Sequence, residues 1–106
     1  MKITRADETI RKNPVSGAEG RIVHGDELTV ASWTFEAGTT LPAHSHPHEQ
    51  ITWVVSGTLK LTIDGTPHVL NPGDSAVIPG GAVHEVTTET AVVVVDAFHP
   101  VREDLQ

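Results

Sequence analysis

The stretch from Gly38 to Gly57 reads GTTLPAHSHPHEQITWVVSG and concentrates the potential chemistry of this chain. Three histidines and a glutamine in it fall at alternate positions: His44, His46, His48 and Gln50. Because successive side chains of an extended strand point to opposite faces, this spacing predicts one strand with all four on the same face. Imidazoles gathered in this way are typical metal ligands. His84, which follows a second segment rich in proline and glycine, is a candidate to complete the site.

Composition narrows the classes of function. The 106 residues include 7 basic and 14 acidic side chains, which give a formal net charge of −7. This balance disfavours nucleic acid as a partner, because phosphate binding needs clustered Lys and Arg. The longest apolar run, Ala91 to Val95, suits a buried strand and is too short to span a bilayer. A charged N-terminus without an apolar signal region, and a chain without cysteine, lead us to expect a cytoplasmic protein without a membrane partner.

The rest of the chain is typical of short strands separated by turn residues. Leu59, Leu61 and Ile63 alternate with polar residues, and Asp64-Gly65 after them is a strong hairpin signal. Strands are expected at 21–24, 27–36, 50–55, 58–64, 68–70, 75–78, 84–87 and 90–98. No segment has a helical period, so we predict an all-β sandwich or barrel, specifically a jelly roll. A single domain should span 1–106, with an N-terminal arm and loop at 1–20 and a C-terminal tail at 99–106.

Two spaced motifs in this chain resemble those of the cupin superfamily. The first resembling segment is Gly38-x5-His44-x-His46-x3-Gln50-x6-Gly57, with glutamine where the family usually has glutamate. The second is Gly73-x5-Pro79-x-Gly81-x2-His84, followed by Thr88 where asparagine is usual. With their spacer they cover about half of the chain. The resemblance implies a small double-stranded β-helix (jelly-roll) barrel that holds one divalent metal through His44, His46, Gln50 and His84.

The glutamine changes the expected electrostatics of that site. Three neutral imidazoles and a neutral amide leave the full charge on a divalent ion, which favours anionic substrates such as carboxylates or enolates. The carboxylate that could act as an internal base in relatives is absent, so a general base must come from elsewhere. Nitrogen-rich ligands suit Zn, Ni, Mn, Fe or Cu, and the ion's identity stays open. His48 follows Pro47 and falls outside the family spacing, so we expect it at the rim rather than on the metal.

The C-terminal segment offers the remaining chemistry. Asp96 follows five apolar residues, and by itself it reads as a turn residue in preference to a carboxylate held near a cavity, because a buried unpaired carboxylate is costly. The segment from Asp96 to Asp104 and the histidine stretch, however, resemble the small cupins of pectin degradation, which convert unsaturated uronates to linear products. That resemblance implies Asp96 as general acid/base, Phe98 as a pocket-shaping residue and Arg102 as the partner of a substrate carboxylate. An arginine fork suits a carboxylate in two-pronged contact.

These observations predict a metal-dependent enzyme that acts on a small oxygen-rich anion, most specifically an unsaturated uronate. Two alternatives remain open at this level: a metal-dependent dioxygenase of the cupin type, and a non-catalytic module that binds a sugar or a metal. The same features also occur in cupins of unknown role and in small metal cyclases of polyketide pathways. We expect a homodimer, because the N-terminal arm at 1–12 could pair with the sheet edge of a neighbouring copy.

Overall fold

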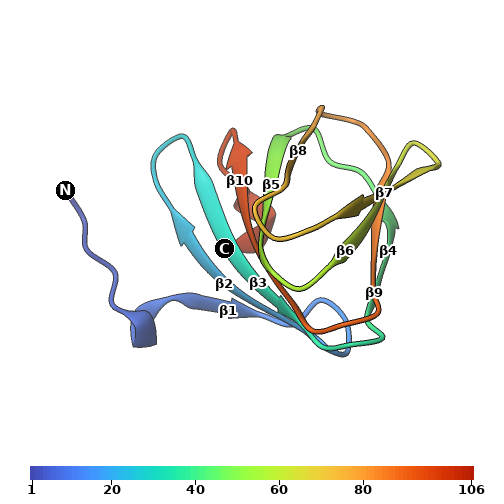
Figure 1. Cartoon of the computed structure of the whole chain (residues 1–106). Coiled ribbons are helices and arrows are strands. Elements are labelled where there is room, and N and C mark those ends of the chain that lie inside the picture. The colour runs from blue at the N-terminus through green and yellow to red at the C-terminus, as the bar shows by residue number, and fades with distance from the viewer.

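Alternation of buried and exposed residues builds ten strands, which the computed structural model, describing residues 1–106, arranges as two facing antiparallel sheets (Figure 1). The six-stranded sheet has the order β1-β2-β3-β10-β5-β8 and the four-stranded sheet the order β4-β9-β6-β7. The strands are β1 (Ile10–Lys12), β2 (Ala18–His24), β3 (Thr29–Phe35), β4 (Thr40–His44), β5 (Glu49–Ser56), β6 (Leu59–Ile63), β7 (Thr66–Leu70), β8 (Ser75–Ile78), β9 (His84–Thr88) and β10 (Val92–His99). Two 3-10 turns, η1 (Ala6–Glu8) and η2 (Glu103–Leu105), lie near the two ends of the chain. The predicted all-β jelly roll is confirmed.

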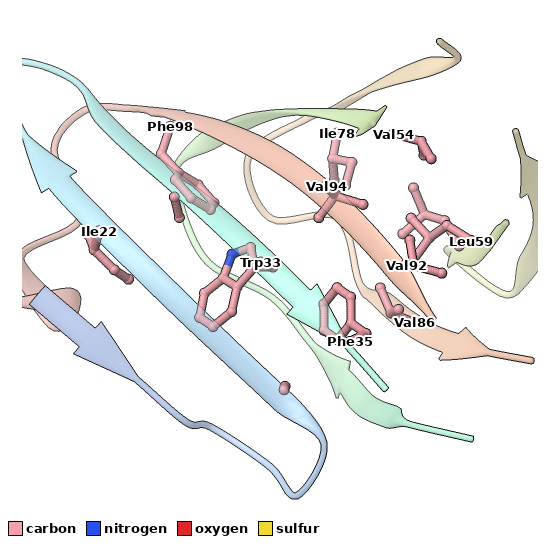
Figure 2. Close-up of a cluster of buried hydrophobic side chains, with 13 residues drawn as sticks. Ile22, Trp33, Phe35, Val54, Leu59, Ile78, Val86, Val92, Val94 and Phe98 are labelled. Atoms are coloured by element: carbon pink, nitrogen blue, oxygen red, sulfur yellow. The ribbon is translucent and has the colours of Figure 1, made fainter. Parts of the chain in front are cut away.

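The core lies between the sheets and follows the period-two pattern of each strand. In β3 the alternate residues from Thr29 to Phe35 are buried, including Trp33, whereas Val30 faces outward and is exposed. Leu59 and Leu61 of β6 are buried as predicted, and Ile63 is half-buried. Figure 2 shows Trp33, Phe35 and Phe98 among the buried apolar side chains of this core. Burial of such side chains is the main favourable contribution to folding.

The histidine stretch is not one strand, so the prediction of a shared strand face is wrong. β4 ends at His44 and pairs with β9 in the four-stranded sheet, whereas β5 begins at Glu49 and pairs with β10 and β8 in the six-stranded sheet. Residues 45–48 carry the chain from one sheet to the other. Pro47 in this connection cannot donate a ladder hydrogen bond, which suits a crossing segment better than a central strand.

Two glycine-containing turns join neighbouring segments, and one of them contacts the crossing segment at residues 45–48. Asp64 (φ 48°) and Gly65 (φ 83°) join β6 to β7, which confirms the predicted hairpin. Gly80 packs against the crossing itself, because a Cβ atom at this position would lie 2.3 Å from the carbonyl oxygen of Pro47. The backbone N–H of Gly81 also donates to the carbonyl of His46 at 2.8 Å. The second motif therefore supports the first through backbone contact.

Neither helical turn approaches the length or apolar character that a membrane-spanning helix requires.

Candidate metal centre

The three histidines of the two motifs meet where the sheets face one another. His44 and His84 are direct partners across the β4–β9 ladder, and their ring centroids lie 4.3 Å apart. His46 reaches the same place from the crossing segment, with its ring centroid 5.0 Å from that of His84. One nitrogen from each ring lies within 4.8 Å of the others, so the cluster could hold a metal ion. His48 does not belong to this cluster.

Backbone carbonyl groups orient all three rings in the same way. The carbonyl oxygens of Pro42, His48 and Ala82 lie 2.8, 3.2 and 2.9 Å from Nδ1 of His44, His46 and His84, respectively. A ring that donates its Nδ1 proton to a carbonyl keeps the lone pair of Nε2 for a metal, which is the usual arrangement of metal-binding histidines. Nε2 of His84 is buried and has no hydrogen-bond partner, as expected of a ligand atom.

Gln50 approaches the cluster from β5 on the opposite sheet. Its Nε2 donates to Oγ1 of Thr52 at 2.9 Å, which turns Oε1 toward His46, whose Nε2 lies 3.0 Å away. Both nitrogens of His46 therefore face carbonyl oxygens, although a neutral imidazole has only one N–H to donate. A cation between Nε2 and the Gln50 oxygen would remove this conflict. The residues present thus fit the metal that the fold family implies.

Burial keeps His46 and His84 in the neutral form that binds metal. It is the largest factor that lowers the pKa of His46, followed by the positive charge of Arg102. Burial also lowers the pKa of His84, which is only 3% exposed, although the hydrogen bond to Ala82 opposes the shift. Both rings are consequently neutral near pH 7, where their nitrogen lone pairs are available to a metal.

A cavity of about 480 Å³ opens beside the histidines. This volume lies within the range of small-molecule sites, roughly 300–1,000 Å³. Aromatic and aliphatic side chains form most of its wall, with Trp33 and Phe98 among them. The polar and charged groups that line it are His44, Gln50, Thr52, His84, Asp96, Arg102 and Asp104. A mostly apolar wall with a few convergent polar groups is typical of an organic ligand site.

Asp96 lies inside β10 and not in a turn, so the interpretation favoured by the residues alone is wrong. Its direct partners across the six-stranded sheet are Ala31 and Thr52, and Phe98 is the direct partner of Gln50. The Asp96 side chain lines the cavity, and its Oδ1 is buried without a hydrogen-bond partner. Burial raises its pKa to about 6, against the opposing effects of Thr52, Gln50 and Arg102. Such a group can both give and accept a proton near neutrality.

Arg102 lines the same cavity from the C-terminal segment. Its guanidinium carbon lies 4.7 Å from the centroid of the Phe98 ring, a cation–π contact. Its Nε and Nη2 donate to the two carboxylate oxygens of Asp104 at 2.9 and 2.6 Å. The guanidinium is thus fixed on one face and along one edge, and no hydrogen bond engages Nη1.

The C-terminal segment is anchored by two groups that local sequence patterns do not identify, His24 and Thr29. Oγ1 of Thr29 accepts the backbone N–H of Arg102 at 2.8 Å and lies 2.8 Å from Nδ1 of His24. The other ring nitrogen of His24 lies 3.2 Å from the carbonyl oxygen of Leu105. One tautomer of His24, with its proton on Nε2, satisfies the whole chain of contacts. His24 therefore holds the tail.

Thr52 and Asp104 were also missed as parts of the site. Thr52 follows Gln50 by two residues on one strand, so period-two alternation places both on the same face and could have identified it. Asp104 shows no such signal, because its contact with the Arg102 side chain depends on how the C-terminal tail folds. His48 is half-buried beside the cluster, with its ring centroid 5.4 Å from that of His46.

Sequence comparison places this geometry in a known family. The profile described as "Cupin domain" matches residues 31–98, a range that includes the three histidines, Gln50, Asp96 and Phe98. The chain belongs to the cupin family. The family resemblance predicted from the two motifs is confirmed.

Relatives extend this assignment along the whole chain. The "Pectin degradation protein KdgF" of Dickeya dadantii is 30% identical over 101 residues, which cover 92% of each chain. The structure of KdgF from Halomonas sp. has a TM-score of 0.87 at 28% identity and covers 100% of this chain and 99% of that one. An RmlC-like cupin from Shewanella frigidimarina has a TM-score of 0.90 at 27% identity and covers 100% and 96%. The predicted similarity to pectin-degradation cupins is confirmed.

Proposed function

We propose that this cupin is a metal-dependent enzyme that converts an unsaturated uronate, a small oxygen-rich anion, to its linear keto isomer. The observation that carries the proposal is the meeting of three kinds of group in one cavity. These groups are histidines of the metal-binding cluster, the buried carboxyl of Asp96 and the guanidinium of Arg102. The similarity to KdgF, a pectin degradation protein, supports the substrate class.

The metal would be held by four neutral side chains, His44, His46, Gln50 and His84. Their nitrogen and amide oxygen atoms suit Zn, Ni, Mn, Fe or Cu in the divalent state. When bound, such an ion supplies Lewis-acid stabilisation of negative charge on a substrate oxygen. Because no ligand carries a charge, the ion's full charge remains to attract an anion.

Arg102 and Phe98 would bind and orient the substrate. A guanidinium pairs with a carboxylate through parallel N–H groups on two nitrogens, and the edge formed by Nη1 and the second N–H of Nη2 of Arg102 is free for this role. The ring of Phe98 packs against one face of the guanidinium and also contributes to the cavity wall. The pair would therefore fix the uronate carboxylate at one end of the cavity, with the sugar ring directed toward the buried polar groups.

Asp96 would move the proton. In the isomerisation the anomeric hydroxyl loses a proton, the ring C1–O bond breaks, and C4 of the resulting enol gains a proton, so a ketone forms at C5. The net change requires no oxidant and no net water. A single carboxyl group with a pKa near 6 can accept the proton from the anomeric hydroxyl and then donate a proton to C4. The chain contains no tyrosine that could act as a phenolic donor.

The test uses purified protein loaded with each divalent metal in turn and a 4,5-unsaturated galacturonate prepared with a pectin lyase. We expect loss of the ultraviolet absorbance of the conjugated double bond, without oxygen uptake. Asp96→Asn should lower turnover by at least about 100-fold while metal content stays unchanged. Glu89→Gln, an equal change of charge at an exposed turn, is the matched control and should turn over normally.

Three other results would overturn the proposal. Oxygen consumption with an enol or catechol substrate would indicate a dioxygenase. Saturable uronate binding without turnover under any metal would indicate a binding module. Loss of metal together with activity in Asp96→Asn would show that Asp96 has a structural role.

A further inference from the structure

One row of direct neighbours across the six-stranded sheet connects the anchor of the C-terminal tail to a proposed metal ligand. The row runs from His24 of β2 through Thr29 of β3 and Phe98 of β10 to Gln50 of β5. Direct partners in an antiparallel ladder have Cα atoms about 4.5–5.5 Å apart, and the ladder fixes their relative positions. A group held by this row is therefore placed relative to the metal centre.

Two neighbouring members of the row hold Arg102. Its backbone N–H donates to Oγ1 of Thr29 at 2.8 Å, and its guanidinium carbon lies 4.7 Å from the centroid of the Phe98 ring. The first contact fixes the main chain of Arg102, and the second contacts the charged end of its side chain. Thr29 is 0% exposed, and a hydrogen bond in such a low-dielectric environment is stronger than one in water.

The tail has few other contacts that could fix its position. No residue after His99 belongs to a strand. Three hydrogen bonds join the tail to the rest of the protein, and they are Arg102 N–H to Thr29 Oγ1, His24 Nε2 to the Leu105 carbonyl and Lys12 Nζ to the Gln106 carbonyl. The third is exposed, whereas the first two are partly buried and meet at the contact between Thr29 and His24. This pair therefore holds both ends of the segment from Arg102 to Leu105.

We propose that Thr29 and His24 act together as positioning residues for Arg102, holding its guanidinium at the distance from the metal centre that a substrate carboxylate requires. The inference rests on the proposed function, in which Arg102 binds the carboxylate of a uronate. Neither Thr29 nor His24 lines the cavity. Their effect on the substrate is consequently transmitted by the tail.

The hydrogen bonds of the pair run in one direction. Oγ1 of Thr29 accepts the N–H of Arg102 and donates its own proton to Nδ1 of His24, whose Nε2–H donates to the Leu105 carbonyl. Loss of either side chain leaves a partner without its hydrogen bond, which is costly for a buried group. Valine has nearly the shape of threonine but no hydroxyl, whereas serine keeps the hydroxyl. Thr29→Val therefore removes the hydrogen bonds, and Thr29→Ser retains them.

Steady-state kinetics of the metal-loaded protein with the 4,5-unsaturated galacturonate test the proposal. We expect Thr29→Val and His24→Leu each to raise KM about three- to tenfold, with kcat changed less than about twofold and metal content unchanged. Thr29→Ser should keep a KM near that of the wild type. The double variant should be no worse than the more damaging single variant, because both changes break one chain of hydrogen bonds. Thr34→Val, at an exposed threonine of the same strand, is the matched control.

Hydrogen exchange of the backbone amides supplies a second measurement that needs no substrate. We expect Thr29→Val to speed exchange at Arg102 by at least about tenfold, while amides of β10 keep the protection of the wild type and show that the variant is folded. Unchanged exchange at Arg102, or additive effects in the double variant, would overturn the proposal. Failure of the wild type to convert the uronate refutes the proposed function, whereas normal wild-type turnover with an unchanged KM in Thr29→Val refutes the positioning role.

Discussion

Arg102 and Asp104 form a two-pronged contact at the edge of the cavity, with Nε to Oδ1 at 2.9 Å and Nη2 to Oδ2 at 2.6 Å. The hydrogen bond from Arg102 is the main cause that lowers the pKa of Asp104 to about 2, so the carboxylate stays ionised across the physiological range. The contact occupies one edge of the guanidinium and leaves Nη1 for a ligand. Asp104 therefore acts as a positioning residue for Arg102.

This geometry predicts the sign of a binding change. Asp104→Ala removes a negative charge near an anionic ligand, which by charge alone should tighten binding. We expect the opposite, a rise of about three- to tenfold in KM for the uronate with a smaller change in kcat, because Arg102 loses its fixed orientation. Glu103→Ala is the control, since Glu103 is a neighbouring exposed carboxylate that forms no side-chain hydrogen bond or ion pair with Arg102. Tighter binding in Asp104→Ala would contradict the positioning role.

The buried carboxyl of Asp96 predicts a pH dependence of stability in the metal-free protein. Its folded pKa of about 6 lies above the ordinary value of 3.8, so between these values the native state holds a proton that the unfolded state has released. The contribution of Asp96 to the free energy of unfolding should therefore fall as pH rises from about 4 to 6, opposite in sign to the contributions of His46 and His84. Asp96→Asn should flatten this decline and raise the melting temperature at about pH 8 in the presence of a chelator. Melting curves for both proteins between about pH 4 and 8 check the prediction. The same pH dependence of stability in the variant and the wild type would refute it.

Replacement of Gln50 by Glu predicts opposite changes in metal affinity and substrate affinity. A carboxylate adds an anionic ligand opposite the three histidines, so we expect Gln50→Glu to bind divalent metal about tenfold more tightly. The partial neutralisation of the ion should at the same time weaken binding of an anionic substrate. Competition with a chromophoric chelator measures the change in metal affinity, and KM reports the change in substrate binding.

His84→Ala, which removes one of the four expected ligands, should abolish the rise in melting temperature that metal addition produces.

Gly80 predicts a steric requirement for the crossing segment. Because a Cβ at this position would lie 2.3 Å from the Pro47 carbonyl oxygen, Gly80→Ala should displace the segment that carries His46. We expect weaker metal binding and a loss of roughly 1–3 kcal/mol of stability, measured by urea unfolding. Gly25→Ala is the control, since its nearest contact would be an ordinary 3.6 Å. Equal behaviour of the two variants would show that the crossing segment tolerates the displacement.

Much of the fold follows from local pattern. The alternation in Leu59–Ile63 and the Asp64-Gly65 turn predicted a hairpin, and the structure contains it. The segment 75–78 was predicted with the bounds that β8 has. These features depend on burial of one strand face and on backbone angles of two residues, which neighbouring positions determine.

The histidine stretch shows where local pattern misleads. Alternate spacing of His44, His46 and Gln50 suggested one strand, yet the chain passes between two sheets within four residues. The alternate spacing picked out side chains that do meet, but for a wrong geometrical reason. Side chains on one strand face stand side by side, whereas in the structure the groups converge from opposite sheets on one volume.

By itself, the sequence determined the strand pattern, the cupin family and the three histidines that meet. Those properties depend on residue type and spacing, which can be read directly from the amino-acid sequence. Only the tertiary structure decided that Asp96 is buried beside Thr52 and that Asp104 holds Arg102. The first depends on strand pairing between segments distant in sequence. The second depends on the fold of the C-terminal tail, which contacts with Thr29 and His24 hold in place.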